Sequence, residues 1–94
     1  MLKRDLVNAV TNEMDGFLKK DINKAIDIML ETIVDALADD RRVEIRGFGS
    51  FSIRKRKART TKNPRTGKVM NIPARKNLHF TMSKSLKDAL IQKG

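Results

Sequence analysis

The pattern of apolar positions predicts two helices in the first forty residues. Between residues 3 and 14, and again between residues 17 and 38, apolar side chains recur at steps of three and four, which gives each helix one buried face. Asp15-Gly16 separates the two segments. The apolar positions are Leu6, Val7, Val10 and Met14 in the first helix and Ile22, Ile26, Met29, Leu30, Ile33 and Leu37 in the second.

From Arg41 the apolar period changes from about 3.6 to 2, which is typical of half-buried strands. Gly47-Phe48-Gly49 supplies a tight connection between two strands, and Ser83 stands where the N-cap of a short closing helix is expected. We therefore predict an α+β fold in which a three-stranded antiparallel sheet lays its apolar face on the helices. The apolar strand positions are Val43, Ile45, Phe51, Ile53, Leu78 and Phe80.

The chain is expected to form one domain with four parts. These parts are a helical dimerisation part (residues 1–40), the sheet (41–53 and 77–82), a protruding arm (54–76) and a C-terminal helix (83–94). Without the arm, about 71 residues remain to form a core, a size at which burial per residue is marginal. Pairing with a second copy or with a related chain is therefore expected.

Positive charge is concentrated in the arm. The formal net charge is +10, and residues 54–76 hold ten Lys or Arg and no Asp or Glu. The remaining residues carry eleven charges of each sign, so the whole excess resides in this segment. Such a distribution indicates a surface that binds a polyanion, and nucleic acid is the expected partner.

A hairpin turn is predicted in the middle of the arm. Asn63-Pro64 followed by Thr66-Gly67 combines the fixed φ of proline with a glycine that tolerates the left-handed conformation. Two strands of about ten residues would extend on the order of 30 Å, long enough to follow a groove around a duplex. Basic runs are often solvated faces or disordered tails. This run is internal, flanked by predicted strands and built around a turn, which favours a structured arm.

The arm contains no aromatic side chain on which bases could stack. Recognition is then left to phosphate neutralisation, guanidinium groups in a narrow groove and an apolar wedge at the tip, for which Pro64 is the candidate. The aromatic residues all lie in apolar patterns and are expected in the core. They are Phe17, Phe48, Phe51 and Phe80.

These motifs resemble the bacterial histone-like HU and integration host factor family. The resemblance spans essentially the whole chain in the same order and implies an intertwined dimer with a helical base, a sheet saddle and two β-ribbon arms. In that family the arms wrap the minor groove of double-stranded DNA, and the proline matching Pro64 inserts between base pairs and helps to bend the duplex. The matching motifs are Arg46-Gly47-Phe48-Gly49-Ser50-Phe51, Arg59, Asn63-Pro64 with Thr66-Gly67, and Phe80 followed by Lys84 and Leu86.

The resemblance also implies roles for individual residues. Those expected to contact DNA are Arg42, Glu44, Arg46, Arg54, Lys55, Arg56, Lys57, Arg59, Lys62, Asn63, Pro64, Arg65, Lys68, Arg75, Lys76, Lys84 and Lys87. Those expected in the dimer core are Ile33, Leu37, Phe48, Phe51 and Phe80. Two positions depart from the family pattern, since Thr61-Lys62 replaces the usual Gly-Arg before Asn-Pro and Met82-Ser83 replaces a Gly before the last helix.

One strand carries a further candidate for recognition. Arg42, Glu44 and Arg46 alternate on one face, where a carboxylate between two guanidinium groups can hold both in fixed poses. An exposed ion-pair ladder that contributes little energy is the alternative. The same spacing before Gly-Phe-Gly is similar to the β-type subunit of integration host factor, which implies a contribution to sequence preference. We hypothesise that Glu44 orients Arg46 for a groove contact.

Other functional classes have little support in the sequence. The chain has no cysteine and one histidine, His79, so no metal site, catalytic triad or cofactor is expected, and the protein is predicted not to be an enzyme. The absence of a secretory segment and of an apolar run near about 18 residues predicts a soluble intracellular protein with no membrane partner. The family resemblance implies a cytoplasmic, nucleoid-associated one. Two alternatives stay open: an RNA-associated basic protein, and an interaction domain whose arm meets an acidic protein.

Overall fold

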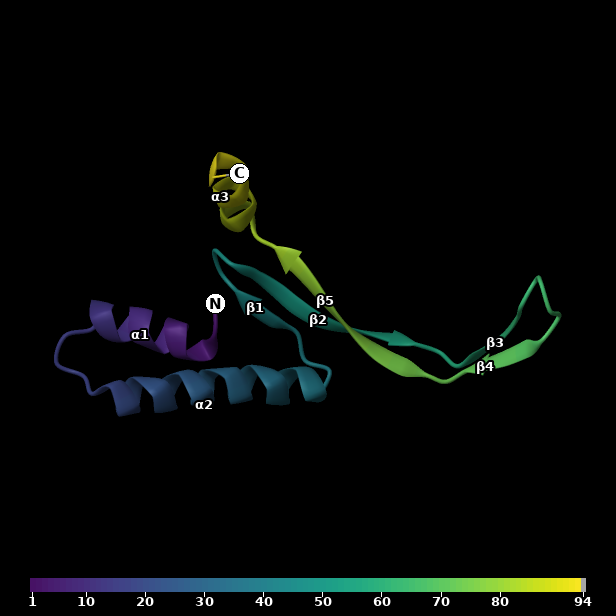
Figure 1. The fold of residues 1–94 in the computed structure, drawn as a ribbon, viewed down its shortest axis with the longest axis horizontal. Helices are drawn as coiled ribbons and strands as arrows, with labels where there is room; N and C mark the ends of the chain where they lie inside the picture. The colour runs from purple at the N-terminus through teal and green to yellow at the C-terminus, as the bar shows by residue number, and fades with distance from the viewer. Residues whose placement is uncertain (94) are drawn as a thin grey trace. The chain divides into compact units, whose positions relative to one another are not determined.

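The computed structural model describes residues 1–93, which form helices at both ends and strands between them (Figure 1). The elements in chain order are α1 (Lys3–Glu13), α2 (Lys19–Ala38), β1 (Val43–Ile45), β2 (Gly49–Arg56), β3 (Arg59–Lys62), β4 (Val69–Ile72), β5 (Arg75–Met82) and α3 (Lys84–Lys93). This order confirms the predicted α+β class. The chain divides into two compact units, one from Met1 to Ala36 and one from Leu37 onward, which are described separately.

The first unit is a helical hairpin with a small core. Val7 of α1 and both Ile22 and Ile26 of α2 are buried against one another, and Val10 packs against them. Complete burial of such side chains contributes about 1.5–3 kcal/mol each, so this core stabilises the hairpin only modestly. The Lys3 ammonium group of α1 forms an exposed ion pair with the Asp27 carboxylate of α2, at 2.6 Å.

The predicted apolar stripe of α2 is buried only in part. Ile22 and Ile26 near its start are buried as expected, but Met29 and Leu30 are exposed, which differs from the prediction. The cause is the length of the partner helix, because the 11 residues of α1 lie beside a helix of 20. The exposed apolar surface on α2 also includes Val34.

In the second unit, β1, β2 and β5 form one antiparallel sheet in the order β1-β2-β5. The register places Val43 opposite Phe51 and Phe51 opposite Phe80, so three apolar side chains cross one face of the sheet in a row. The next row, on the other face, is Glu44, Ser50 and Thr81, taken across the same strands. The sheet therefore has an apolar face and a polar face, as the alternation predicts.

The aromatic residues of the sheet gather in one cluster. The ring centroids of Phe51 and Phe80 are 4.8 Å apart, and Phe48 lies 5.6 Å from Phe80. The prediction that these rings are buried in a core is wrong for the single chain, because Phe48 is 45% exposed and Phe80 is 38% exposed. Phe17, in the first unit, is also exposed, contrary to expectation. The cause in the sheet is that no described element of the second unit covers the rings.

Gly49 is buried at the point where β2 leaves the hairpin connection. A Cβ atom built on this glycine would lie 2.6 Å from two ring carbons of Phe80 and 2.6 Å from the carbonyl oxygen of Thr81. Only glycine lets β2 and β5 approach this closely beside the aromatic ring. The preceding Gly47 has a φ of 84°, which lets the chain turn between β1 and β2.

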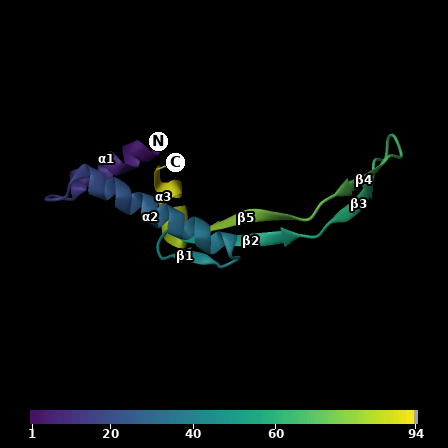
Figure 2. The same cartoon turned by 90° about the horizontal axis from the view of Figure 1, so that it is seen from below.

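The arm continues β2 and β5 as a second ladder, in which β3 pairs with β4 (Figures 1 and 2). The sequence suggested two continuous strands of about ten residues each, whereas the structure interrupts both strands, at residues 57–58 and 73–74. Pro73 lies in one interruption and has no N–H group to donate to a ladder, which explains the break. Figure 2 shows that the ribbon changes direction between the β2–β5 part and the β3–β4 part.

The last helix begins at the predicted cap. The N–H of Leu86 donates to the Ser83 hydroxyl oxygen at 3.1 Å, and the N–H of Lys87 donates to the Ser83 carbonyl oxygen at 3.0 Å. The N–H of Ser83 in turn donates to the carbonyl oxygen of Phe48, which ties the start of α3 to the β1–β2 connection. The predicted N-cap role of Ser83 is confirmed.

Candidate nucleic-acid interface

The tip of the arm is a closed turn that exposes a proline. The N–H of Asn63 donates to the Lys68 carbonyl oxygen at 2.9 Å, and the N–H of Gly67 donates back to the Asn63 carbonyl oxygen at 2.8 Å. The Asn63 side chain accepts a further hydrogen bond from the N–H of Arg65. These bonds hold the backbone on both sides of Pro64, whose ring is exposed. The tip thus presents an apolar ring on a fixed turn, beside the cation of Arg65.

The strands of the arm carry exposed cations along their length. Because the ribbon has only two strands, both of its faces meet solvent and every basic side chain on it is exposed. The basic residues that the structure places on the arm are Arg54, Lys55, Arg56, Lys57, Arg59, Lys62, Arg65, Lys68, Arg75 and Lys76. All ten were predicted to contact a polyanion, and the structure brings them together on one ribbon.

Like charges face one another at the base of the arm. Arg56 of β2 is paired in register with Arg75 of β5, and Lys55 is paired with Lys76. Directly opposed like charges destabilise a ladder, so each pair attracts a counterion or an acidic group. Since successive residues alternate, the arginine pair lies on the polar face of the sheet and the lysine pair on its apolar face.

The two pairs have different surroundings. Arg56 and Arg75 line an open hollow of about 330 Å³ together with Lys57, Arg59, Ile72 and Asn77. No acidic side chain lines this hollow, so its four cations are available to phosphate groups. The lysine pair, in contrast, is bound to a carboxylate.

That carboxylate belongs to Asp40, just after the end of α2. One of its oxygens lies 3.1 Å from Nζ of Lys55 and the other lies 3.1 Å from Nζ of Lys76. Hydrogen bonds from Lys55 and then from Lys76 lower the pKa of the Asp40 carboxyl below its ordinary value. Asp40 has a φ of 61°, a left-handed conformation that Asp adopts more readily than most residues.

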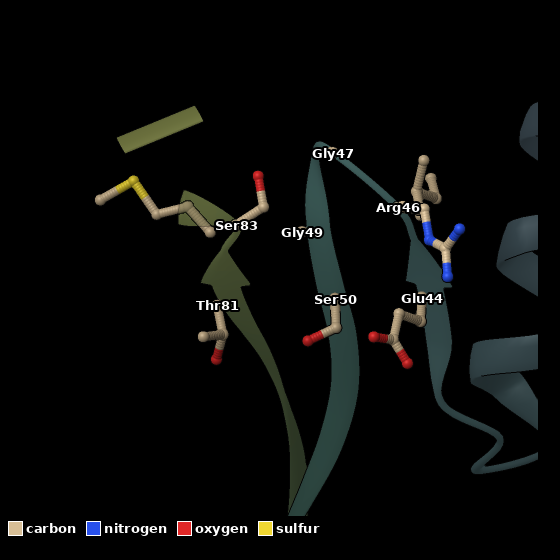
Figure 3. Close-up of a pocket in the computed structure, with 9 residues that line it drawn as sticks. Glu44, Arg46, Gly47, Gly49, Ser50, Thr81 and Ser83 are labelled. Carbon is tan, nitrogen blue, oxygen red and sulfur yellow. The ribbon is translucent and has the colours of Figure 1, made fainter. Parts of the chain in front are cut away.

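The polar face of the sheet has an open recess beside the β1–β2 connection. Its volume is about 570 Å³. Glu44, Ser50 and Thr81, which form one cross-strand row, line it with Arg46 and Ser83 (Figure 3). The remaining lining residues are Ile45, Gly47, Gly49 and Met82. The recess therefore combines one carboxylate, one guanidinium group and hydroxyl groups from three segments.

The expected triad of Arg42, Glu44 and Arg46 is not formed in the free chain. The Arg42 guanidinium group donates instead to the Ser50 hydroxyl oxygen at 3.2 Å. Among the residues that the structure describes, Glu44 takes part in no ion pair. The reason is geometric, because β1 has only three residues and Arg42 and Arg46 flank it outside the ladder.

The start of α3 adds two further cations. Lys84 and Lys87 are exposed on its first turn, as expected. The Ser83 hydroxyl, however, already accepts from the N–H of Leu86, so it serves the helix first. A phosphate at this end would meet the two ammonium groups and the helix N-terminus.

His79 is the single histidine of the chain. The His79 ring nitrogen Nε2 lies 3.2 Å from the Thr81 hydroxyl oxygen, and within residues 1–93 no group of three or more acidic or histidine side chains is placed to hold a metal ion. None of the helices in this range is both long and apolar enough to span a membrane.

Asp40 is the candidate functional residue that the sequence did not reveal. Asp39 and Asp40 directly follow the second predicted helix, and nothing in the spacing connects position 40 with positions 55 and 76. The only available signal was the register of the arm, which places two lysines opposite each other and so calls for an acid.

The comparisons with known proteins agree with this geometry. A family model described as bacterial DNA-binding protein matches residues 1–91. The chain is 47% identical over 90 residues to the DNA-binding protein HU-1 of Halalkalibacterium halodurans, covering 96% of this chain and 99% of that protein. It is 44% identical over 93 residues to the DNA-binding protein HU 1 of Bacillus subtilis, covering 99% of this chain and 100% of that protein.

Solved structures show the same likeness in three dimensions. The structure of an Anabaena HU–DNA cocrystal aligns with a TM-score of 0.78 at 38% identity, covering 96% of this chain and 97% of that chain. HU from Thermotoga maritima aligns with a TM-score of 0.64 at 30% identity, covering 96% and 98%.

Proposed function

Since this chain belongs to the bacterial DNA-binding protein family, which includes the HU proteins, we propose that it is an architectural protein that binds double-stranded DNA in the minor groove and bends it. The observation that carries this proposal is the arm, a ribbon of ten exposed cations that ends in an exposed proline on a fixed turn. The cocrystal of a similar HU with DNA supports the choice of ligand.

Phosphate contacts supply most of the affinity in this mechanism. Each Lys or Arg that neutralises a phosphate releases condensed counterions from the duplex, and this gain is independent of base sequence. The four cations of the hollow at the arm base grip the backbone where the arm leaves the sheet. A guanidinium group nearer the tip, that of Arg65, reaches a narrow groove.

Pro64 supplies the bend. Its ring has no hydrogen-bonding group, so its insertion at a base step replaces stacking between bases with contact to an apolar wedge and kinks the duplex. The turn bonds of Asn63 fix the ring in place before binding, so little ordering is required at the moment of insertion. Bent DNA then meets more of the cationic surface, which offsets the cost of unstacking.

The surface assigned to DNA comprises the arm, the polar face of the sheet and the start of α3. Its residues are Arg42, Glu44, Arg46, Arg54, Lys55, Arg56, Lys57, Arg59, Lys62, Asn63, Pro64, Arg65, Lys68, Arg75, Lys76, Lys84 and Lys87. These residues act by binding, without a cofactor or a catalytic step. The protein acts in the cytoplasm, at the nucleoid.

The active form is a dimer, of two identical chains or of this chain with a related one. Two exposed apolar surfaces support this step: the aromatic cluster of Phe48, Phe51 and Phe80, and the face of α2 around Val34, which is 63% exposed. Apolar side chains left in water on this scale favour association. Ile33 and Leu37, half-buried on α2, complete the proposed dimer core.

The recess beside the β1–β2 connection gives the protein a sequence preference, as the likeness of this strand to the β-type subunit of integration host factor suggests. DNA recruits Arg46 into a groove, and Glu44 orients it there although the two are not paired in the free chain. Affinities of wild type and Glu44→Ala for a panel of varied duplexes test this point. The variant should bind all duplexes in the panel with similar affinity, while its mean affinity stays that of wild type. If the order of affinities among the duplexes is unchanged, Glu44 has no role in sequence preference.

A competition between duplex DNA and duplex RNA of the same sequence tests the function as a whole. An arm that fits the narrow minor groove of B-form DNA meets a wide, shallow minor groove in A-form RNA. The protein should therefore bind the DNA duplex more tightly than the RNA duplex. Equal competition would favour an RNA-associated protein. If neither nucleic acid binds this chain but an acidic protein does, the result would favour an interaction domain.

A further inference from the structure

The lysine pair at the arm base differs from every other cationic group on the arm, because an acid of the same chain occupies it. The two oxygens of Asp40 are each 3.1 Å from a different ammonium group, one on β2 and one on β5. A phosphodiester group also presents two anionic oxygens on one atom, so it can bridge the same two ammonium groups. Asp40 thus stands where a phosphate would bind.

The contact is open to exchange. The side chains of Lys55 and Lys76 are 67% and 53% exposed, and that of Asp40 is 35% exposed, so each can leave the other without a change in the fold. Ion pairs at exposed sites contribute little and are screened by salt. The phosphates of DNA, with their high local charge density, compete effectively for the lysines.

The position of the pair adds a second, independent observation. Lys55 and Lys76 continue the apolar face of the sheet, whereas Arg54, Arg56 and Arg75 continue its polar face. The arm base is therefore cationic on both faces, but among the described residues only the lysine face carries an acid. DNA held on the arginine face reaches the lysine face only where it follows the ribbon around.

We propose that Lys55 and Lys76 form a phosphodiester site on this second face of the arm base, and that Asp40 occupies it until a DNA phosphate displaces the carboxylate. Asp40 is then an internal competitor that weakens DNA binding in the wild-type chain. This inference rests on the DNA-binding function proposed above and adds a residue that opposes it.

Asp40→Asn removes the competitor with little other change. Asparagine tolerates the left-handed backbone at this position as well as aspartate does, and its side chain is of the same size. Asp39→Asn is the matched control, because it makes the same change in net charge one residue away. Asp39 lies 3.7 Å from Arg41 and forms no ion pair with the two lysines.

The test is to measure the affinity of wild type, Asp40→Asn and Asp39→Asn for one duplex at fixed salt. Asp40→Asn should bind about three- to tenfold more tightly than Asp39→Asn, the range expected from the release of two exposed ion pairs. If Asp40→Asn binds DNA as tightly as Asp39→Asn or more weakly, the proposal is overturned, and the role of Asp40 is to stabilise the base of the arm. If wild type binds no duplex at all, the proposed function itself fails.

Carbon-13 NMR of the Asp40 carboxyl gives a second readout in the wild-type protein, which does not depend on the folding of any variant. In the free protein the two lysines hold the pKa of this carboxyl below its ordinary value. On addition of duplex DNA the pKa should rise, because the carboxylate loses both ammonium groups and gains phosphates as neighbours. A pKa that stays low in the complex would show that the ion pairs persist and would overturn the displacement.

Discussion

Pro64 is the side chain that we propose determines the shape of the bound DNA. It lies at the end of the ribbon, exposed, with the turn closed on both sides by the hydrogen bonds of Asn63. Pro64 combines an apolar surface with a backbone that is fixed before binding. Bending is therefore expected to depend on this residue more than binding does.

Pro64→Ala should reduce bending with a smaller loss of affinity. The cations that neutralise phosphates remain, but the wedge and the fixed φ are lost. Energy transfer between dyes at the two ends of a short duplex reports the bend, and titration reports the affinity. Equal transfer in the saturated complexes of mutant and wild type would remove the wedge role.

Gly49 lies where β2 and β5 approach each other too closely for a side chain. A methyl group there would lie 2.6 Å from the Phe80 ring and from a backbone oxygen, so Gly49→Ala should lower the free energy of unfolding by about 1–3 kcal/mol. Urea denaturation measures this. Ser50→Ala, which changes the neighbouring residue on the opposite face, is the control. Equal stability of the two variants would show that the strands separate easily to admit a methyl group.

At the scale of elements, local patterns in the sequence were sufficient for most of the fold. The stripes of α1 and α2, the alternation around Gly47 and the Asn63-Pro64 turn each depend on neighbours within a few residues, and each element was found. The break at Pro73 was not predicted, because the arm was interpreted from its basic residues and its turn alone. Pro73 has no N–H group to donate to a strand ladder.

Features that depend on tertiary contacts could not be predicted from the sequence. The pairing of Asp40 with Lys55 and Lys76 requires the register of two strands and the end of a helix to be known together. The triad expected around Glu44 did not form because Arg42 lies outside the three-residue strand β1 and donates instead to Ser50 across the ladder. The exposure of Phe48 and Phe80 reflects surface that the chain does not cover by itself.

The exposed face of α2 leads to a prediction about assembly. Val34→Glu places a carboxylate in the proposed interface, where burial of an unpaired charge costs several kcal/mol. The variant should be monomeric or partly unfolded in native mass spectrometry at concentrations where wild type is dimeric. Lys24→Gln, on an exposed position of the same helix, makes the same change in net charge and should leave the dimer intact. A dimeric Val34→Glu would exclude this face from the interface.

At the scale of the whole molecule, the chain separates its tasks along the sequence. The helical unit has a small core and an exposed apolar surface, the sheet has a polar face with a recess, and the arm holds the whole net charge excess. In the proposed mechanism, substitutions of the arm cations act first on affinity, substitution of Pro64 acts first on bending, and substitution of Glu44 acts first on sequence preference. Membership of the bacterial DNA-binding family is consistent with each of these parts.

The central claim, that phosphate binding by the arms is coupled to bending of the duplex, is tested most directly by one titration. Wild-type protein is added to a short duplex with a dye at each end, at low and at moderate salt. End-to-end energy transfer should rise in step with binding, and if the dimer contacts six to ten phosphates the affinity should fall by roughly 10³–10⁵ between 50 and 200 mM salt. Binding that leaves the transfer unchanged, or that is indifferent to salt, would contradict the account.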